Sequence, residues 1–390
     1  MKNAFFLKTI NLPEELKLIL YLLKGDKPRK IDSALLKDID WKQFMELSLH
    51  HRVYPILHSK IKQLDAIPPH VRNFLSNQYK SNTLQMLQLS GVMEGLSREF
   101  ALNHIQVIFL KGPALAHDLY GDISMRTSSD LDLLIPIEQL GKADNLLINQ
   151  GYEKDDYIHT VLNDWKWRHH HVTYFHPVTK VKLEIHWRLN PGPAYEPFFK
   201  SLWDRKRTSK LTTFPVYLLS KEDLFFFLIS HGARHGWSRL RWLVDIGQLL
   251  EQDFHWGKTQ KVIKKCHYQR AAGQGLLLAS QLLEAKLSNR MRVIANKTSS
   301  KQLAQQAIFY LERQVNLHTD PVPEEIARYH KSHLFSLMSI QQRAFFILSF
   351  LYPYPEDYQT LPLPKPFHFL YFPLRPFLWV WRKKRKHALP

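Results

Sequence analysis

One stretch of this chain, residues 107–136, constrains its fold and its chemistry most strongly. It reads VIFLKGPALAHDLYGDISMRTSSDLDLLIP, which predicts a short apolar strand, a Lys-Gly-Pro turn, a helix, a polar loop and a second strand. The second strand carries Asp130 and Asp132, and side chains two apart in a strand point to the same face. Because paired carboxylates repel one another, a fold keeps them together mainly to hold a divalent cation, which can in turn bind phosphate. A solvated turn before the strand is the alternative, but we favour an enzyme of phosphate chemistry.

The length and charge of the chain bound its organisation and its partners. At 390 residues it exceeds the roughly 250–300 residues at which one core usually divides, so two or three domains are expected. Its 54 Lys and Arg residues exceed its 35 Asp and Glu residues and give a net charge of +19. Such an excess favours an anionic partner such as a nucleotide, a nucleic acid or a membrane surface, and an even scatter of lysine is the alternative.

Cysteine content and hydropathy indicate the compartment. The single cysteine, Cys266, permits no internal disulfide and no cysteine-based metal site, which fits a reducing cytoplasm. Its neighbours Lys264 and Lys265 would lower the pKa of an accessible thiol, but a half-buried helix cysteine is expected. No window offers about 20 uninterrupted apolar residues and no secretory signal is visible, so we expect a cytoplasmic protein without a transmembrane helix.

Periodicity predicts an α+β fold, in which a small mixed β-sheet is flanked by N-terminal and C-terminal helical regions. Helices are expected over Glu14–Leu23, Trp41–His58 and Arg72–Asn103, and a hairpin from Trp167–His176 and Val181–Leu189. The expected parts are an N-terminal helical region at 1–105, a catalytic core at 106–215, a C-terminal helical domain at 216–355 and a Pro-rich, aromatic and basic tail at 356–390.

A third carboxylate is expected beside the two aspartates. The strand at 181–189 alternates apolar and ionic residues, which places Glu184 on its polar face. Phosphoryl and nucleotidyl transfer need metal ions to neutralise phosphate charge and to activate the attacking oxygen. Glu184 is therefore the candidate that completes the metal site, and a surface ion pair with Lys182 or Arg188 is the alternative.

The turn and a later helix supply candidates for phosphate binding. Gly112 permits a tight turn before a helix whose N-terminus presents free N–H groups to a triphosphate. Lys111 and Arg126 would add charge to the same phosphates. The helix that carries His235 is expected to close over the nucleotide, with His235, Arg239 or Arg241 near the phosphates; a structural role for these residues is the alternative.

The remaining histidines and Asp245 give weaker signals. His231 and His235 stand four apart, but Gly232 occupies the place of the glutamate that a zinc-protease helix requires, so zinc is rejected. At residues 169–171, alternation along a strand would send the middle histidine away from its neighbours, so no metal cluster is expected there. His186 is expected to donate to a carboxylate, to act as a base or to pack beside a tryptophan. Asp245 is expected to cap its helix or to pair with an arginine on the preceding turn.

Several motifs together resemble a known family. LKGPAL at 110–115, Arg126, DLDLL at 130–134 and LEIHW at 183–187 resemble the uncharacterised nucleotidyltransferases of the polymerase-β-type superfamily. SHGARHGWSRLRWLVDI at 230–246 is similar to the helical signature that follows the catalytic sheet in that family, and the resemblance covers roughly residues 30–330.

The resemblance implies an activity and its cofactor. It implies a transferase that moves a nucleoside monophosphate from an NTP such as ATP to a hydroxyl-bearing acceptor and releases pyrophosphate. Asp130, Asp132 and Glu184 would hold Mg²⁺, with Mn²⁺ as an alternative. The acceptor is open among a small molecule, a sugar, a peptide, a protein and RNA.

The turn departs from the superfamily pattern at one position. Gly112 is followed by Pro113, where Gly-Ser or Gly-Gly is typical, and proline offers neither an N–H nor a hydroxyl group. Lys111 is therefore expected to take over the phosphate contact. The alternative function is a catalytically decayed nucleotidyltransferase-fold protein that acts as a basic module binding nucleic acid or membrane.

The C-terminal tail combines aromatic residues with the basic run at 382–386. Such a combination suits the headgroup layer of a membrane, which would make the protein peripheral at the inner membrane face. A tail wrapped over the domain with a solvated basic end is the alternative that we favour.

Overall fold

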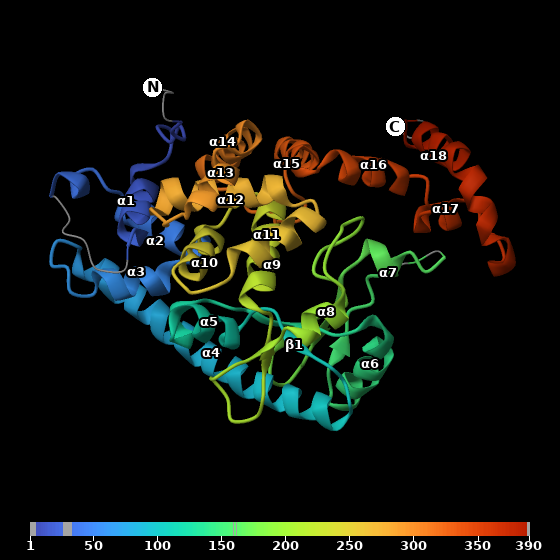
Figure 1. Cartoon of the computed structure of the whole chain (residues 1–390), viewed down its shortest axis with the longest axis horizontal. Coiled ribbons are helices and arrows are strands. Elements are labelled where there is room, and N and C mark those ends of the chain that lie inside the picture. Colours follow the sequence, from blue (N-terminus) through green and yellow to red (C-terminus); the bar gives the residue numbers. More distant parts are fainter. Residues whose placement is uncertain (1–4, 26–32, 159, 161, 388–390) are drawn as a thin grey trace.

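The computed structural model of the chain describes residues 5–25, 33–158, 160 and 162–387 (Figure 1). Its centre is a seven-stranded mixed sheet with the order β3-β4-β5-β2-β1-β7-β6. The strands are β1 (Ile108–Phe109), β2 (Asp130–Leu134), β3 (Glu153–Lys154), β4 (His171–Phe175), β5 (Lys182–His186), β6 (Arg207–Thr208) and β7 (Tyr217–Leu218). Strand β2 is parallel to β5 and antiparallel to β1. The two strands that carry the predicted carboxylates are therefore neighbours.

Helices precede, interrupt and follow the sheet. Those before it are α1 (Glu14–Leu23), α2 (Trp41–His50), α3 (Tyr54–Ile61) and α4 (Pro69–Leu102). Those between its strands are α5 (Pro113–Tyr120), α6 (Leu140–Asn149), α7 (Trp165–Arg168) and α8 (Phe199–Asp204). Those after it are α9 (Lys221–Arg234), α10 (Leu240–Leu250), α11 (Trp256–Lys265), α12 (Gln269–Leu283), α13 (Asn289–Ala295), α14 (Thr298–Glu312), α15 (Glu324–Leu337), α16 (Ile340–Ser349), α17 (Pro355–Thr360) and α18 (Tyr371–His387). Short 3₁₀ turns lie at Ser33–Leu36, Ile123–Met125, Ile137–Gln139 and Lys365–Leu370.

Two large hydrophobic cores organise these elements. Helices α1–α3 and α9–α14 share one core, although all seven strands of the sheet lie between them in sequence (Figure 1). The sheet shares the other with α6 and the C-terminal half of α4. Helix α4 belongs to both, because Val71 and Leu75 pack in the first core, whereas Met86, Met93 and Phe100 pack in the second. The long helix thus joins the sheet to the helical bundle.

The predicted α+β class and the mixed sheet between helical regions are confirmed. The helix predicted over Trp41–His58 is in fact two, α2 and α3, because Arg52 adopts a left-handed φ of 55° that interrupts the helix. The division into parts at residues 105, 215 and 355 stays a prediction, and the sheet itself extends to Leu218. Cys266 follows α11 and is buried, and burial raises the pKa of its thiol to about 11, so the two preceding lysines do not activate it.

Candidate active site

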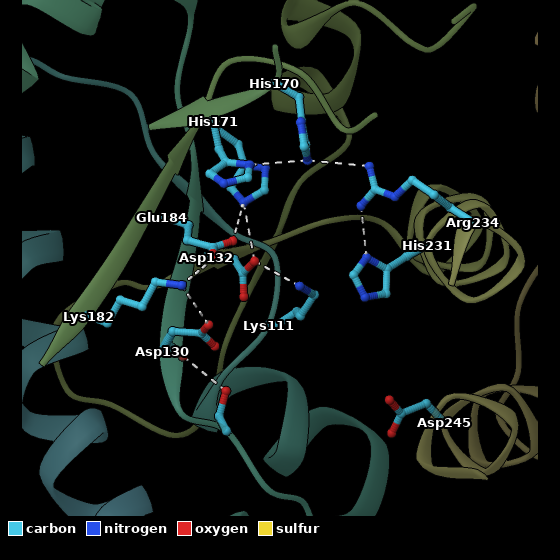
Figure 2. Close-up of polar contacts among 12 residues, drawn as sticks. Lys111, Asp130, Asp132, His170, His171, Lys182, Glu184, His231, Arg234 and Asp245 are labelled. Atoms are coloured by element: carbon cyan, nitrogen blue, oxygen red, sulfur yellow. Dashed lines mark hydrogen bonds and ion pairs between the residues drawn. The ribbon is translucent and has the colours of Figure 1, made fainter. Parts of the chain in front are cut away.

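The register of two parallel strands brings the predicted carboxylates together. Asp132 on β2 lies opposite Glu184 on β5. Their apolar neighbours Leu131 and Leu183 point to the other side of the sheet, into the core shared with α4. Figure 2 shows Asp130 on the same side of the sheet as this pair. Alternation in each strand therefore leaves one acidic face directed at the helical bundle.

The Lys-Gly-Pro turn connects β1 to α5 and positions Lys111. Gly112 has a φ of +81°, and an added Cβ would lie 2.9 Å from Cδ2 of Leu131. This position therefore requires glycine for both its backbone angle and its close packing. The Nζ of Lys111 lies 2.8 Å from Oδ1 of Asp132. The turn thus places an ammonium directly on the acidic face.

We expect Gly112→Ala to destabilise the protein by about 1–3 kcal/mol, because a non-glycine residue with this φ is strained. The added methyl group also has to displace Leu131. Urea denaturation followed by circular dichroism measures the change. Gly247→Ala on α10 is the control, since it has a negative φ and nothing within 4 Å of its added Cβ. Equal stability of both variants and the parent protein would contradict this account of the turn.

Asp132 is fully buried and ionised. Burial alone would raise the pKa of its carboxyl group, but the ammonium of Lys111 and a hydrogen bond from His186 lower it to about 2. The Nε2 of His186 lies 3.2 Å from Oδ1 of Asp132 and 3.5 Å from Oε2 of Glu184. His186 therefore bridges the two carboxylates and reduces their repulsion.

The ammonium of Lys182 lies between the carboxylates of Glu184 and Asp130. Its Nζ lies 2.8 Å from Oε1 of Glu184 and 3.9 Å from Oδ2 of Asp130. Glu184 is largely shielded from water, which opposes ionisation, yet its hydrogen bond with His186 lowers the pKa of its carboxyl group. Burial and the charge of Asp132 instead raise the pKa of Asp130. The acidic face thus contains two strongly ionised carboxylates and a third that gives up its proton less readily.

A chain of imidazole and guanidinium groups joins this face to α9. The Nδ1 of His171 lies 3.1 Å from Nε2 of His170, which lies 3.3 Å from Nη1 of Arg234. The Nη2 of Arg234 lies 3.3 Å from Nδ1 of His231 (Figure 2). The expectation that strand alternation sends His170 away from His171 is therefore wrong, whereas the absence of a metal at residues 169–171 stays a prediction. Strand β4 begins only at His171, so strand alternation does not separate it from His170.

The described residues contain two three-residue groups able to hold a metal ion. Within each, the ligand atoms lie within 4.8 Å of one another; the groups are Asp132, Glu184 and His186, and His170, His171 and His186. In the first group, Oδ2 of Asp132 is buried and has no hydrogen-bond partner among the described residues, which is uncommon for such an atom. Carboxylate and imidazole ligands around an unpartnered oxygen fit a divalent cation. Metal binding by Asp130, Asp132 and Glu184 stays a prediction.

Arg126 occupies a different environment from Lys111. Its guanidinium is 1% exposed and donates to both oxygens of Asp245 on α10, at 3.1–3.2 Å. The hydroxyl of Tyr120 donates to the same carboxylate at 2.7 Å. The partner of Asp245 therefore comes from the loop before β2 and not from the preceding helical turn. A triphosphate contact by Arg126 stays a prediction, and it would require this buried pair to open.

The residues expected at the nucleotide from the later helices lie at the end of α9 and the start of α10. His235 stacks on Trp242 and His318, with ring centroids 5.1 and 5.5 Å away, and burial lowers the pKa of its imidazole. Arg239 is half-buried, and burial together with the charge of Arg52 lowers the pKa of its guanidinium to about 10. Their predicted nucleotide contacts stay predictions.

Arg52 is the residue that the sequence analysis missed. It lies between α2 and α3, and the charge of Asp130 raises the pKa of its guanidinium, against the larger lowering effect of burial. Within the described part of the chain, neither Arg52 nor Arg239 has a side-chain hydrogen bond or ion pair. Two half-buried guanidinium groups that repel each other and have no ion pair among the described residues are suited to binding an anion. The sequence carried no signal for Arg52, because it lies inside a stretch predicted to be one continuous helix.

The mixed sheet and its acidic face are consistent with a nucleotidyltransferase fold. The model of the family described as "Uncharacterised nucleotidyltransferase" matches residues 37–284, and the chain belongs to this family. No curated protein matches the chain. It is also similar to the crystal structure of an antigenic nucleotidyltransferase-like protein from Paracoccidioides brasiliensis, at 18% identity and a TM-score of 0.30, over 52% of this chain and 94% of that one.

Proposed function

We propose that this protein is a metal-dependent nucleotidyltransferase that moves the nucleoside monophosphate of an NTP to a hydroxyl-bearing acceptor. The observation that supports this most strongly is the register that sets Asp132 beside Glu184 on a buried polar face. In the reaction the acceptor oxygen bonds to the α-phosphorus, the bond from that phosphorus to pyrophosphate breaks, and the acceptor hydroxyl loses its proton.

The carboxylates would hold Mg²⁺ or Mn²⁺. Such an ion, when bound, neutralises phosphate charge and lowers the pKa of the acceptor hydroxyl. Asp132 supplies a buried carboxylate for it, and Glu184 and Asp130 supply two partly exposed ones. His186 keeps the first two oriented through its contacts of 3.2 and 3.5 Å.

The cationic groups around this face would bind the triphosphate. The ammonium of Lys111 forms an ion pair with Asp132. It would contact a phosphate oxygen instead when a cation binds to the carboxylate of Asp132. Arg52 and Arg239 supply two further donors with no competing partner among the described residues. Arginine is suited to this role because its planar fork binds two phosphate oxygens at once.

Transfer of label from an NTP tests the proposed activity. The full chain is incubated with Mg²⁺, a cell extract and each NTP labelled at the α-phosphate, and the fraction that takes up label contains the acceptor. Release of pyrophosphate from the same mixture confirms the bond that breaks. If no NTP transfers label and none binds in the presence of Mg²⁺, the proposed function is wrong.

Arg52→Gln and Arg239→Gln are each expected to weaken NTP binding about 10-fold, the loss of one charge-assisted hydrogen bond. Isothermal titration calorimetry in Mg²⁺ measures this affinity. Arg292→Gln on α13 is the matched control, because it removes an exposed arginine of the helical bundle. Unchanged affinity in both test variants would remove the pair from the triphosphate site.

A further inference from the structure

Helix α18 is held on its protein-facing side by ion pairs as well as by apolar packing. Its protein-facing side is held by charge, since Arg375 and Arg382 both donate to the buried carboxylate of Asp357 on α17. Tyr371 and Leu378 are buried on the same side. A surface helix normally buries its apolar stripe and exposes its polar residues. Because these ion pairs hold α18 against α17, the opposite side of α18 is the one available for contact with another surface.

The outward side of α18 is aromatic. Helical spacing places Phe372 and Trp379 on one exposed stripe and Phe377 and Trp381 on the next. Phe372 and Trp379 are 45% and 53% exposed, and Phe377 and Trp381 are 72% and 49% exposed. Four large aromatic residues exposed on one helix cost free energy in water, so such a face indicates a contact surface.

Each aromatic stripe ends in a lysine. Lys383 continues the stripe of Trp379, with its Nζ 5.3 Å from the centre of that ring, and Lys384 continues the stripe of Trp381. Both lysines are exposed, and α18 contains no acidic residue. Any surface that covers the aromatic rings must therefore also accept positive charge.

An anionic lipid surface meets both requirements. Tryptophan rings suit the boundary between headgroups and acyl chains, and lysines attract anionic headgroups. A second copy of α18 would instead bring further cations. The neighbouring α16 also exposes apolar residues, among them Ile347 and Leu348 at 57% and 58%. Figure 1 shows α16–α18 extending from the helical bundle beyond α15.

We propose that the outward face of α18 docks the protein on an anionic membrane surface. The aromatic side chains enter the interface and Lys383 and Lys384 contact the headgroups. None of the helices in the described residues is long and apolar enough to cross a bilayer. The helix would therefore lie on the membrane, and this docking does not depend on the proposed activity.

Co-sedimentation of the full chain with vesicles tests the proposal. We expect binding to vesicles of phosphatidylcholine mixed with phosphatidylglycerol, weak binding to phosphatidylcholine alone, and loss of binding as salt is raised. Lys383→Gln with Lys384→Gln should weaken binding about 30-fold. Phe377→Ser, Trp379→Ser and Trp381→Ser together should abolish it while thermal denaturation stays that of the parent protein.

Matched substitutions on other helices distinguish membrane docking by α18 from non-specific binding of exposed apolar residues and lysines to vesicles. Leu84→Ser with Leu87→Ser removes exposed apolar residues from α4, and Lys264→Gln with Lys265→Gln removes exposed lysines from α11. Both controls should bind vesicles like the parent protein. No binding to anionic vesicles overturns the proposal, as does equal loss in test and control variants. Concentration-dependent dimerisation that the aromatic variant abolishes, without vesicle binding, would assign the face to a second copy.

Discussion

Asp132→Asn is expected to lower the rate of nucleotidyl transfer about 100-fold or more. The substitution keeps the shape of the side chain and an oxygen for Lys111 and His186, but it removes the buried negative charge. A catalytic metal ion contributes several kcal/mol of transition-state stabilisation, and about 1.36 kcal/mol is a factor of ten in rate. Transfer of label from an α-labelled NTP measures the rate, and electron paramagnetic resonance of Mn²⁺ measures metal binding separately.

Asp155→Asn is the matched control for Asp132→Asn. Asp155 is an exposed aspartate directly after β3, at the edge of the same sheet, and its loss should change neither rate nor Mn²⁺ binding. Full activity in Asp132→Asn would show that the buried carboxylate is not part of the catalytic machinery. Lost activity with unchanged Mn²⁺ binding would restrict its role to orienting Lys111 and His186.

Arg126→Met is expected to reduce the free energy of unfolding by about 3–5 kcal/mol, because it leaves the buried carboxylate of Asp245 without its ionic partner. Both side chains are at most 1% exposed, so water cannot replace the lost bonds. Adding Asp245→Asn should restore part of the stability, since it removes the stranded charge. Urea denaturation followed by tryptophan fluorescence measures all three proteins.

A surface ion pair provides the comparison for this substitution. Arg328 and Glu324 pair on α15 with side chains 79% and 87% exposed, so Arg328→Met should change the free energy of unfolding by less than about 0.5 kcal/mol. If Arg126→Met is as stable as the parent protein but binds NTP more weakly, the triphosphate role predicted for Arg126 from sequence is correct and the structural role is wrong.

Local patterns predicted much of this fold and the most compact part of the site. The predicted helix over Glu14–Leu23 coincides with α1, and alternation correctly placed Leu183 and Glu184 on opposite faces of one strand. The Lys-Gly turn and the strand that carries Asp130 and Asp132 could be predicted because they lie close together in sequence. Each also has a recognisable local pattern of residues. That Asp132 lies opposite Glu184 is a property of strand pairing, which the sequence only suggested.

The contacts that the sequence analysis missed are those set by tertiary packing. The partner of Arg126 comes from more than a hundred residues away, and no local pattern connects it with Asp245. The left-handed turn at Arg52 was hidden because histidine, arginine and valine carry no turn signal. His170 meets Arg234 only because α9 packs across the acidic face. Such contacts depend on how helices pack and not on their periodicity.

Helix α4 has a consequence for how this protein folds and unfolds. Because one continuous helix contributes apolar residues to both cores, neither core can lose it without exposing buried surface. A fragment that starts after residue 105 would leave one face of the sheet uncovered, although the sequence predicts a domain boundary at that residue. We therefore expect the sheet and the bundle to unfold in one cooperative transition, and a chain that lacks α4 to lose the packing that supports the acidic face.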